Sequence, residues 1–154
     1  MVSDKVPQPG DANFVGPLPQ ETSTVFRVQR GTHPDRSKRS KFLIAIDESG
    51  NTQIKSDRLN ISIGDESHAD HFLTLRPGAE VVSFKIPKWM DEFIEQESWA
   101  QYGASKKPHY DKNTIPLLND PTTPGRSHEL PPLWAKWLEE YAIPGSGKIL
   151  RQHD

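Results

Sequence analysis

The sequence predicts an α+β fold in one domain, with several short strands and two or three small helices between them. Its 154 residues suit a single domain and leave little room for a second. Hydrophobic residues make up 33% of the chain and the mean hydropathy is −0.73, which indicates a small apolar core and many polar loops. Segments that alternate like strands are interleaved with segments whose apolar residues recur at helical spacing, and this mixture favours a mixed class.

The charge and the cysteine content of the chain exclude several classes of function. Lys and Arg total 19 against 21 Asp and Glu, so the formal charge of −2 argues against a surface that binds nucleic acid or anionic lipid throughout. The chain has no cysteine, which excludes a disulfide framework, thiol catalysis and Cys-ligated metal sites. No run approaches the roughly 18 apolar residues of a membrane span, and the first residues lack the apolar stretch of a Sec signal. We therefore expect no membrane association, and any export would use other machinery.

The start of the chain divides into a leader and a first strand. Prolines and glycines punctuate residues 1–22, which are predicted to be a leader or linker ahead of a folded domain over 23–154. A β-rich run follows at Thr24–Gly31, and its alternation places Arg27 on the face opposite Phe26. A charged side chain in the middle of a strand either binds an anion in a cleft or reaches water from an edge strand.

A basic loop and a hairpin come next. His33–Lys41 carries four cations against one acid and is predicted to be a solvated loop. Two apolar runs, Lys41–Ile46 and Asn51–Lys55, flank the turn residues Asp47–Gly50, which is the signature of a β-hairpin.

The segment Leu59–Gly64 alternates as a strand with one apolar face. Asn60 and Ser62 lie together on its other face, where they are either solvent-facing or part of a hydrogen-bonding site. A short helix is predicted directly after it, over Glu66–Leu73.

The second half of the chain is predicted to hold two strands, two helices and a long turn. Pro116 places the second of these strands at a sheet edge. The elements are a strand at Val81–Ile86, a helix from Pro87, a strand at Thr114–Leu118, a turn at Pro121–Leu130 and a helix from Pro131 that stops at Pro144.

Two motifs are set aside. Gly145–Lys148 resembles part of a phosphate-binding loop, but that pattern requires Gly where Ala142 stands and Ser or Thr where Ile149 stands. His68 and His71 share a helix face, but no third ligand lies at a recognisable spacing, so no metal site is predicted.

Histidines leave a second enzyme class open. A metal-independent RNase needs two proton-transfer groups beside a phosphate, and His109 or His128 could supply one. His33 and His153 are further candidates, but nothing in the sequence pairs any two of these side chains. A non-enzymatic binding module is the third class, and it would leave Arg27 without a role.

An arginine, a hydroxyl and a glutamate follow one another along the chain as Arg27, Ser62 and Glu129. In this order they resemble the arginine–serine–glutamate class of mono-ADP-ribosyltransferases, which implies a split two-sheet β core with NAD, as substrate, in the cleft. The resemblance assigns the NAD phosphates to Arg27 and the ribosyl cation to Glu129, with Ser62 orienting Glu129. Asn60 and Gly31 complete the implied NAD-binding set.

The closing segment Trp137–Lys148 carries the most specific part of the resemblance, which covers residues 24–150. It is similar to the TreTu-type toxin domain at the tips of bacterial Rhs polymorphic proteins. This similarity implies a type VI secretion effector that enters the cytoplasm of a target bacterium and blocks translation by modifying elongation factor Tu, with ribosomal RNA as the alternative acceptor. An Rhs shell as delivery vehicle and a cognate immunity protein are the implied partners, and we expect the latter to cover the NAD cleft with an acidic face.

The chain departs from that family at two positions. The middle strand of the family often reads Ser-Thr-Ser, where this chain has Asn60 and Ser62 around Ile61. Many relatives carry Glu or Gln two residues before the catalytic glutamate, where this chain has Ser127. The acceptor group is therefore left open, and Glu139 and Glu140 stay open as alternatives to Glu129.

Overall fold

The computed structural model describes residues 21–30, 41–64, 66–74, 78–100, 109–119 and 125–152. Within them the chain forms three short helices and a large mixed sheet, an architecture compatible with the predicted α+β class. The strands are β1 (Thr22–Arg30), β2 (Ile44–Ile46), β3 (Thr52–Ile54), β4 (Leu59–Ile63), β5 (Ala79–Pro87), β6 (Trp99–Ala100), β7 (Leu117–Leu118), β8 (Ser127–Leu130) and β9 (Lys148–Gln152). The helices are α1 (Ser67–Thr74), α2 (Lys88–Glu97) and α3 (Pro132–Tyr141).

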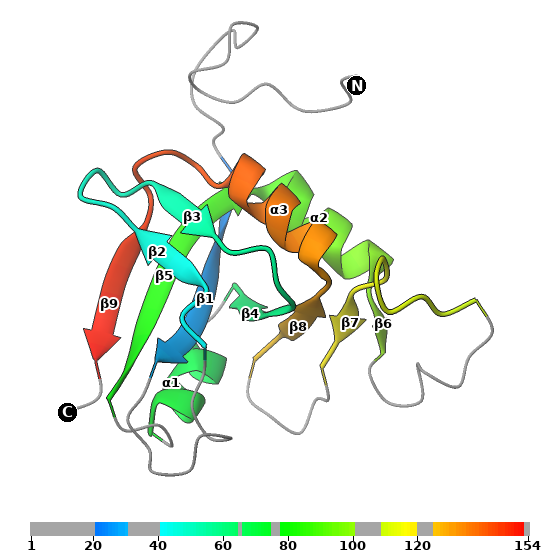
Figure 1. The fold of residues 1–154 in the computed structure, drawn as a ribbon, viewed down its shortest axis with the longest axis horizontal. Helices are drawn as coiled ribbons and strands as arrows, with labels where there is room; N and C mark the ends of the chain where they lie inside the picture. The colour runs from blue at the N-terminus through cyan, green and yellow to red at the C-terminus, as the bar shows by residue number, and fades with distance from the viewer. Residues whose placement is uncertain are drawn as a thin grey trace, which may run out of the picture.

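Among the described residues, seven strands form one sheet in the order β6-β7-β8-β4-β1-β5-β9. All neighbours in it run antiparallel except β6 and β7, which are parallel. The predicted hairpin is confirmed as β2 and β3, which form a separate two-stranded sheet. Figure 1 shows this hairpin in front of β1 and β5, with α2 and α3 together at one end of the molecule and α1 at the other.

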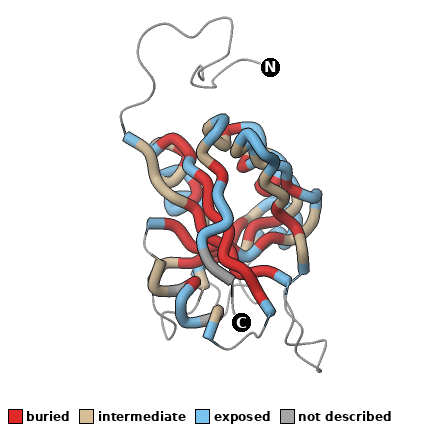
Figure 2. The backbone as a smooth tube through the Cα atoms, turned by 90° about the vertical axis from the view of Figure 1, so that its left-hand side faces the viewer, coloured by how far each residue is buried: buried red, intermediate tan, exposed pale blue. Residues whose placement is uncertain are grey.

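Side-chain alternation along β1 creates two apolar layers, one on each face of the sheet. Val25 faces the larger core, where the β2–β3 hairpin, α2 and α3 pack. Phe26 and Val28 face the other side, where Ala69 of α1 packs against them. Figure 2 shows the buried central strands in red and the exposed edge strand β9 in pale blue. The central strands read as almost continuously buried because both of their faces are covered.

Two predictions about the second half of the chain are wrong. The predicted turn over Pro121–Leu130 ends in a strand, because residues 127–130 pair with β4 as β8. The predicted strand at Thr114–Leu118 shortens to β7, and it is not the sheet edge because β6 pairs with its far side.

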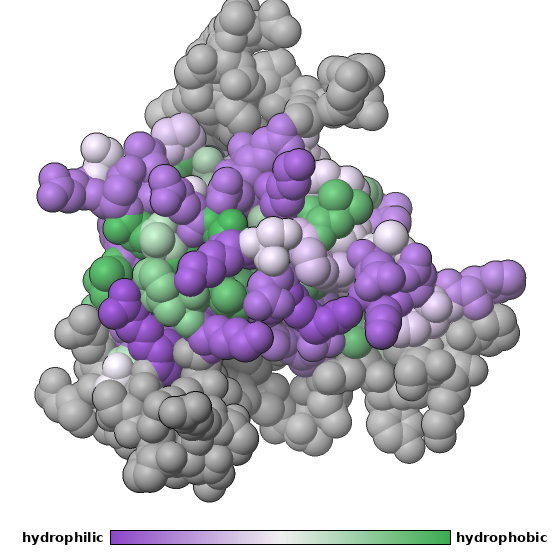
Figure 3. All heavy atoms as spheres, in the orientation of Figure 1, coloured by the Kyte–Doolittle hydropathy of each residue, from purple (hydrophilic) through white to green (hydrophobic). Residues whose placement is uncertain are grey.

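The motif at Gly145–Lys148 packs against the hairpin turn. The Gly147 N–H donates to the Gly50 carbonyl at 2.7 Å, and the Gly145 N–H donates to the Asn51 side chain at 3.1 Å. These contacts place the start of β9 beside β5, with which β9 pairs as the edge strand of the sheet. Figure 3 shows a largely hydrophilic face here, with apolar surface toward β9, where Ile149 and Leu150 are exposed. No helix in the described part of the chain has the length and apolar character needed to cross a membrane.

Candidate functional site

Three neighbouring strands carry the three residues of the predicted catalytic set. Arg27 lies on β1, Ser62 on β4 and Glu129 on β8, and β4 lies between the other two. Asn60 pairs directly with Glu129, and two residues along β4 Ser62 pairs with Ser127. Paired residues of neighbouring strands project to the same side, so Asn60, Ser62 and Glu129 share one face of the sheet.

Arg58 lies directly before β4, two residues before Asn60, and its guanidinium reaches Glu129 on this face. Its Nη1 lies 3.7 Å from Oε2 of Glu129, and its Nη2 donates to the Lys112 carbonyl at 2.9 Å. The two side chains are 33% and 23% exposed, so a ligand can reach both. We call Arg58, Asn60, Ser62 and Glu129 the β4–β8 site. Sequence reasoning did not select Arg58, although its period-two spacing to Asn60 and Ser62 was a usable signal.

Arg27 projects from the opposite face of the sheet, as the alternation predicts. It is 6% exposed, so the interpretation of an edge-strand arginine with its head in water is wrong. Its guanidinium donates to the carbonyl oxygens of Asn60 at 2.8 Å and Lys41 at 2.9 Å. It reaches Asn60 because β1 and β4 pair at Val25 and Phe26 and no further along β1. Arg27 thus joins the backbone of the β4–β8 site to the segment that leads into β2.

Ser62 is 1% exposed, and its hydroxyl has no hydrogen-bond partner among the residues that the structure describes. A buried hydroxyl without a partner costs about 1–3 kcal/mol, so a native chain rarely retains one without a reason. The hydroxyl makes no hydrogen bond to Glu129, and the orienting role assigned to it stays a prediction. Gly31, the last member of the implied set, lies outside the described residues.

Aromatic residues continue the same face beyond Glu129. Leu117 of β7 pairs with Glu129, and Trp99 of β6 pairs with Leu117. The ring centroids of Trp99 and Tyr110 are 5.8 Å apart. The face therefore presents a guanidinium, a carboxylate and, two strands away, aromatic rings, the groups that recognise an anionic ligand with flat rings.

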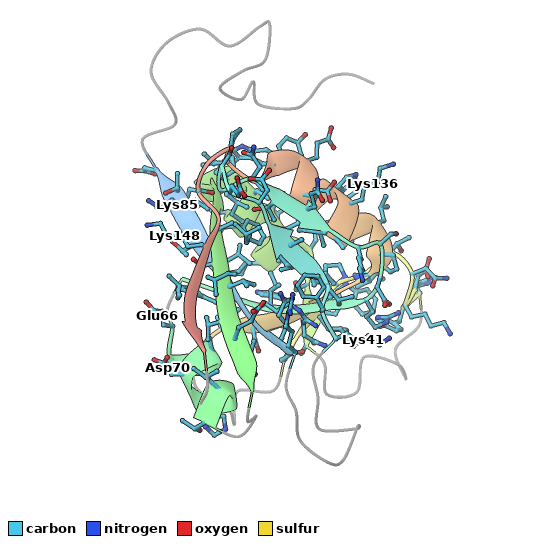
Figure 4. All side chains as sticks on the ribbon, turned by 60° about the vertical axis from the view of Figure 1, so that its left-hand side comes forward. Lys41, Glu66, Asp70, Lys85, Lys136 and Lys148 are labelled. Atoms are coloured by element: carbon cyan, nitrogen blue, oxygen red, sulfur yellow. The ribbon has the colours of Figure 1, made fainter. Side chains whose placement is uncertain are left out.

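A second ion pair, between Lys41 and Asp57, lies beside the β4–β8 site. Lys41 Nζ is 3.5 Å from Oδ2 of Asp57, and the Arg58 backbone N–H donates to Oδ1 of Asp57 at 2.7 Å. That backbone hydrogen bond, with the charge of Lys41, lowers the pKa of Asp57, which therefore stays ionised. Figure 4 shows Lys41 on the opposite side of the view from Lys85 and Lys148, which project near the β5–β9 edge.

His128 lies inside the protein, although it is next to Glu129 in the sequence. It is 0% exposed and pairs with Ile61 on the face of the larger core. Its Nδ1 lies 2.9 Å from the Ser98 hydroxyl. Burial, assisted by the charge of Arg126, lowers its pKa to about 4. His128 therefore has no access to a substrate phosphate or to the surface of a protein partner.

The other candidate residues lie elsewhere. The Glu139 carboxylate, on α3, accepts the Ile54 N–H and so holds the hairpin, while Glu140 is exposed on the same helix. His109 is exposed in a loop. An open hollow of about 370 Å³ lies between the hairpin turn and the start of β9, and no residue of the β4–β8 site lines it. Within the described ranges, no three His, Asp or Glu side chains gather as metal ligands would.

Comparison of the chain with family models, with curated proteins and with solved structures finds no match. A functional assignment therefore rests on the arrangement of the described residues and on the motif resemblance.

Proposed function

We propose that this chain is an NAD-dependent mono-ADP-ribosyltransferase with an ADP-ribosyltransferase-like core. One observation carries the proposal. Arg27, Ser62 and Glu129 span 102 positions of the sequence, yet they lie on three adjacent strands, β1, β4 and β8. Ser62 and Glu129 moreover share a face, and the Arg27 guanidinium bonds the backbone of Asn60, the residue opposite Glu129.

Glu129 would act on the charge that develops when NAD is cleaved. The bond between the nicotinamide nitrogen and the ribose C1′ breaks, and its electron pair leaves with neutral nicotinamide. The ribose is then an oxocarbenium-like cation, as in glycoside hydrolysis. A carboxylate aimed at that cation lowers the barrier. A nucleophile of the acceptor forms the new bond to C1′ and releases its proton to solvent or a base.

Ser62 supplies a hydroxyl that needs a partner. In the proposed complex it donates to the Glu129 carboxylate or to a ribose hydroxyl, which would satisfy a polar group that is otherwise buried alone. The exposed Asn60 side chain lies between Ser62 and Arg58 on the same face and adds an amide to the ribose-binding surface.

Arg27 would support the β4–β8 site from the other side of the sheet. Its hydrogen bonds to the carbonyls of Asn60 and Lys41 hold the segment around Lys41 against β4, beyond the point where β1 and β4 stop pairing. The direct contact of Arg27 with an NAD phosphate that the resemblance implies stays a prediction; its hydrogen bonds at 2.8 and 2.9 Å are to the backbone carbonyls of Asn60 and Lys41.

The biological role follows from the resemblance alone. We propose an antibacterial toxin, delivered by an Rhs shell into the cytoplasm of a target bacterium, that stops translation by modifying elongation factor Tu. A cognate immunity protein would protect the producing cell.

The acceptor can be tested with labelled NAD. The purified domain is incubated with NAD labelled in the adenylate and with either purified elongation factor Tu or purified ribosomes. We expect label on elongation factor Tu. Label on ribosomal RNA would move the activity to the alternative acceptor. No label on either, nor on any component of a bacterial lysate, would contradict a transferase.

A further inference from the structure

Two guanidinium groups lie near the β4–β8 site, and they differ in what they can offer a ligand. Arg27 is buried, and it donates to two backbone carbonyls. Arg58 is a third exposed and projects on the same face as Glu129. An anionic substrate that approaches Glu129 from solvent therefore meets Arg58 first.

The partners of Arg58 use little of its donor capacity. Nη2 donates to the Lys112 carbonyl at 2.9 Å, but Nη1 and the Glu129 carboxylate are 3.7 Å apart, beyond hydrogen-bond distance. A guanidinium makes its strongest contacts as a two-pronged donor to a carboxylate or a phosphate. The present contact with Glu129 is a loose ion pair, which a better-matched anion can displace.

The same ion pair conflicts with the work proposed for Glu129. A carboxylate stabilises a developing cation less well when a guanidinium already neutralises it. If Arg58 moved to the pyrophosphate of the substrate, it would bind the substrate and release the Glu129 charge toward the ribose in one event.

We propose that Arg58 binds the pyrophosphate of NAD at this site and exchanges Glu129 for phosphate oxygens when NAD binds. This inference rests on the proposed function and deepens it. Asp57 supports the exchange, because its carboxylate accepts the Arg58 backbone N–H and so fixes the main chain while the side chain moves. Lys41 is a weaker candidate for the same role, since its ammonium lies 3.5 Å from Asp57 and its side chain is 76% exposed.

Calorimetric titration with a non-hydrolysable NAD analogue tests the exchange on the full chain. Arg58→Ala should weaken binding at least tenfold. Lys112→Ala is the matched control: it removes a neighbouring charge but keeps the carbonyl that Arg58 uses, so its affinity should stay within twofold of wild type. Circular dichroism and thermal unfolding of each variant establish that it is folded.

A double-mutant cycle separates competition from simple attraction. Glu129→Gln removes the carboxylate that competes for Arg58, so it should tighten binding at least threefold when Arg58 is present. In the Arg58→Ala background the same change should have no effect. Equal affinities of wild type and Arg58→Ala, or an equal effect of Glu129→Gln in both backgrounds, would overturn the role of Arg58 while leaving the transferase proposal intact. A wild-type protein that does not bind the analogue would overturn both.

Discussion

Ser62 and Ser127 lie opposite each other in the pairing of β4 with β8, but their hydroxyls differ in bonding. The Ser127 hydroxyl accepts a hydrogen bond from the Asn119 side chain at 3.0 Å. The Ser62 hydroxyl is equally buried and has no partner. Two identical side chains in paired positions thus provide a test of whether the unpartnered hydroxyl is kept for catalysis.

Ser62→Ala is expected to lower transferase activity without lowering stability. It removes a buried polar group without a partner, so the free energy of unfolding should stay constant or rise by up to about 1 kcal/mol. Transferase activity should fall about tenfold, because the ribose or Glu129 loses a donor. Urea unfolding and nicotinamide release measure the two effects.

Ser127→Ala should show the reverse behaviour. It leaves the Asn119 amide without its acceptor, so about 1 kcal/mol of stability is lost while activity is retained. If both variants lost stability and kept activity, Ser62 would have no part in the reaction.

Arg27→Lys is expected to destabilise the fold. A lysine keeps the charge but cannot donate to both carbonyls with the geometry of a guanidinium, so about 2 kcal/mol should be lost with one charged hydrogen bond. Arg30→Lys on the same strand is the control. Arg30 is half exposed and 3.5 Å from Glu80, so its exchange should cost less than about 1 kcal/mol. Equal unfolding midpoints for the two variants would contradict the structural role of Arg27.

Burial of His128 predicts a stability loss in mild acid. Its pKa of about 4 lies below the unfolded value of 6.5, so between these values the unfolded chain binds more protons. Stability is therefore full above pH 6.5 and falls as the pH drops toward 4, by about 2 kcal/mol between pH 7 and pH 5. His128→Gln should show a flatter profile over this interval in urea unfolding. Identical slopes for the two proteins would mean that His128 titrates normally.

Gly50→Ala should loosen the contact between the hairpin and the loop before β9. Gly50 has a φ of +80°, and an added Cβ would lie 2.7 Å from the Gly145 carbonyl oxygen. We expect a loss of about 2 kcal/mol or more. Gly64→Ala is the matched control, because its φ is +99° but nothing lies within 4 Å of an added Cβ. Backbone strain alone should then cost about 1 kcal/mol. Equal losses of stability for Gly50→Ala and Gly64→Ala in thermal unfolding would show that the close approach to Gly145 adds no cost beyond backbone strain.

Local patterns predicted much of this fold. The period of two in Leu59–Ile63 predicted β4 and the side on which Asn60 and Ser62 project. The turn residues between two apolar runs predicted the β2–β3 hairpin. These features depend on residues that are neighbours in the chain, so the sequence carries them directly.

Long-range pairing could not be predicted in the same way. Residues 127–130 contain a serine, a histidine and a glutamate and resemble a loop, but they form β8 because β4 and β7 offer hydrogen bonds on both sides. The spacing of Arg58 to Asn60 and Ser62 is a local signal, but its contact with Glu129 joins residues far apart in the sequence and could not be predicted from it. The burial of His128 likewise depends on which face of β8 meets the core.

Glu129→Gln tests the central claim most directly. Nicotinamide release and transfer of label from NAD are measured for wild type, for Glu129→Gln and for Glu92→Gln, an exposed glutamate of α2 that serves as the control. The exchange keeps size and shape but removes the charge that would stabilise the ribosyl cation. We predict that Glu129→Gln folds normally and loses at least a hundredfold in rate, about 3 kcal/mol of barrier, while Glu92→Gln keeps wild-type rates. A folded Glu129→Gln protein that still releases nicotinamide and transfers ADP-ribose at the wild-type rate would contradict the account.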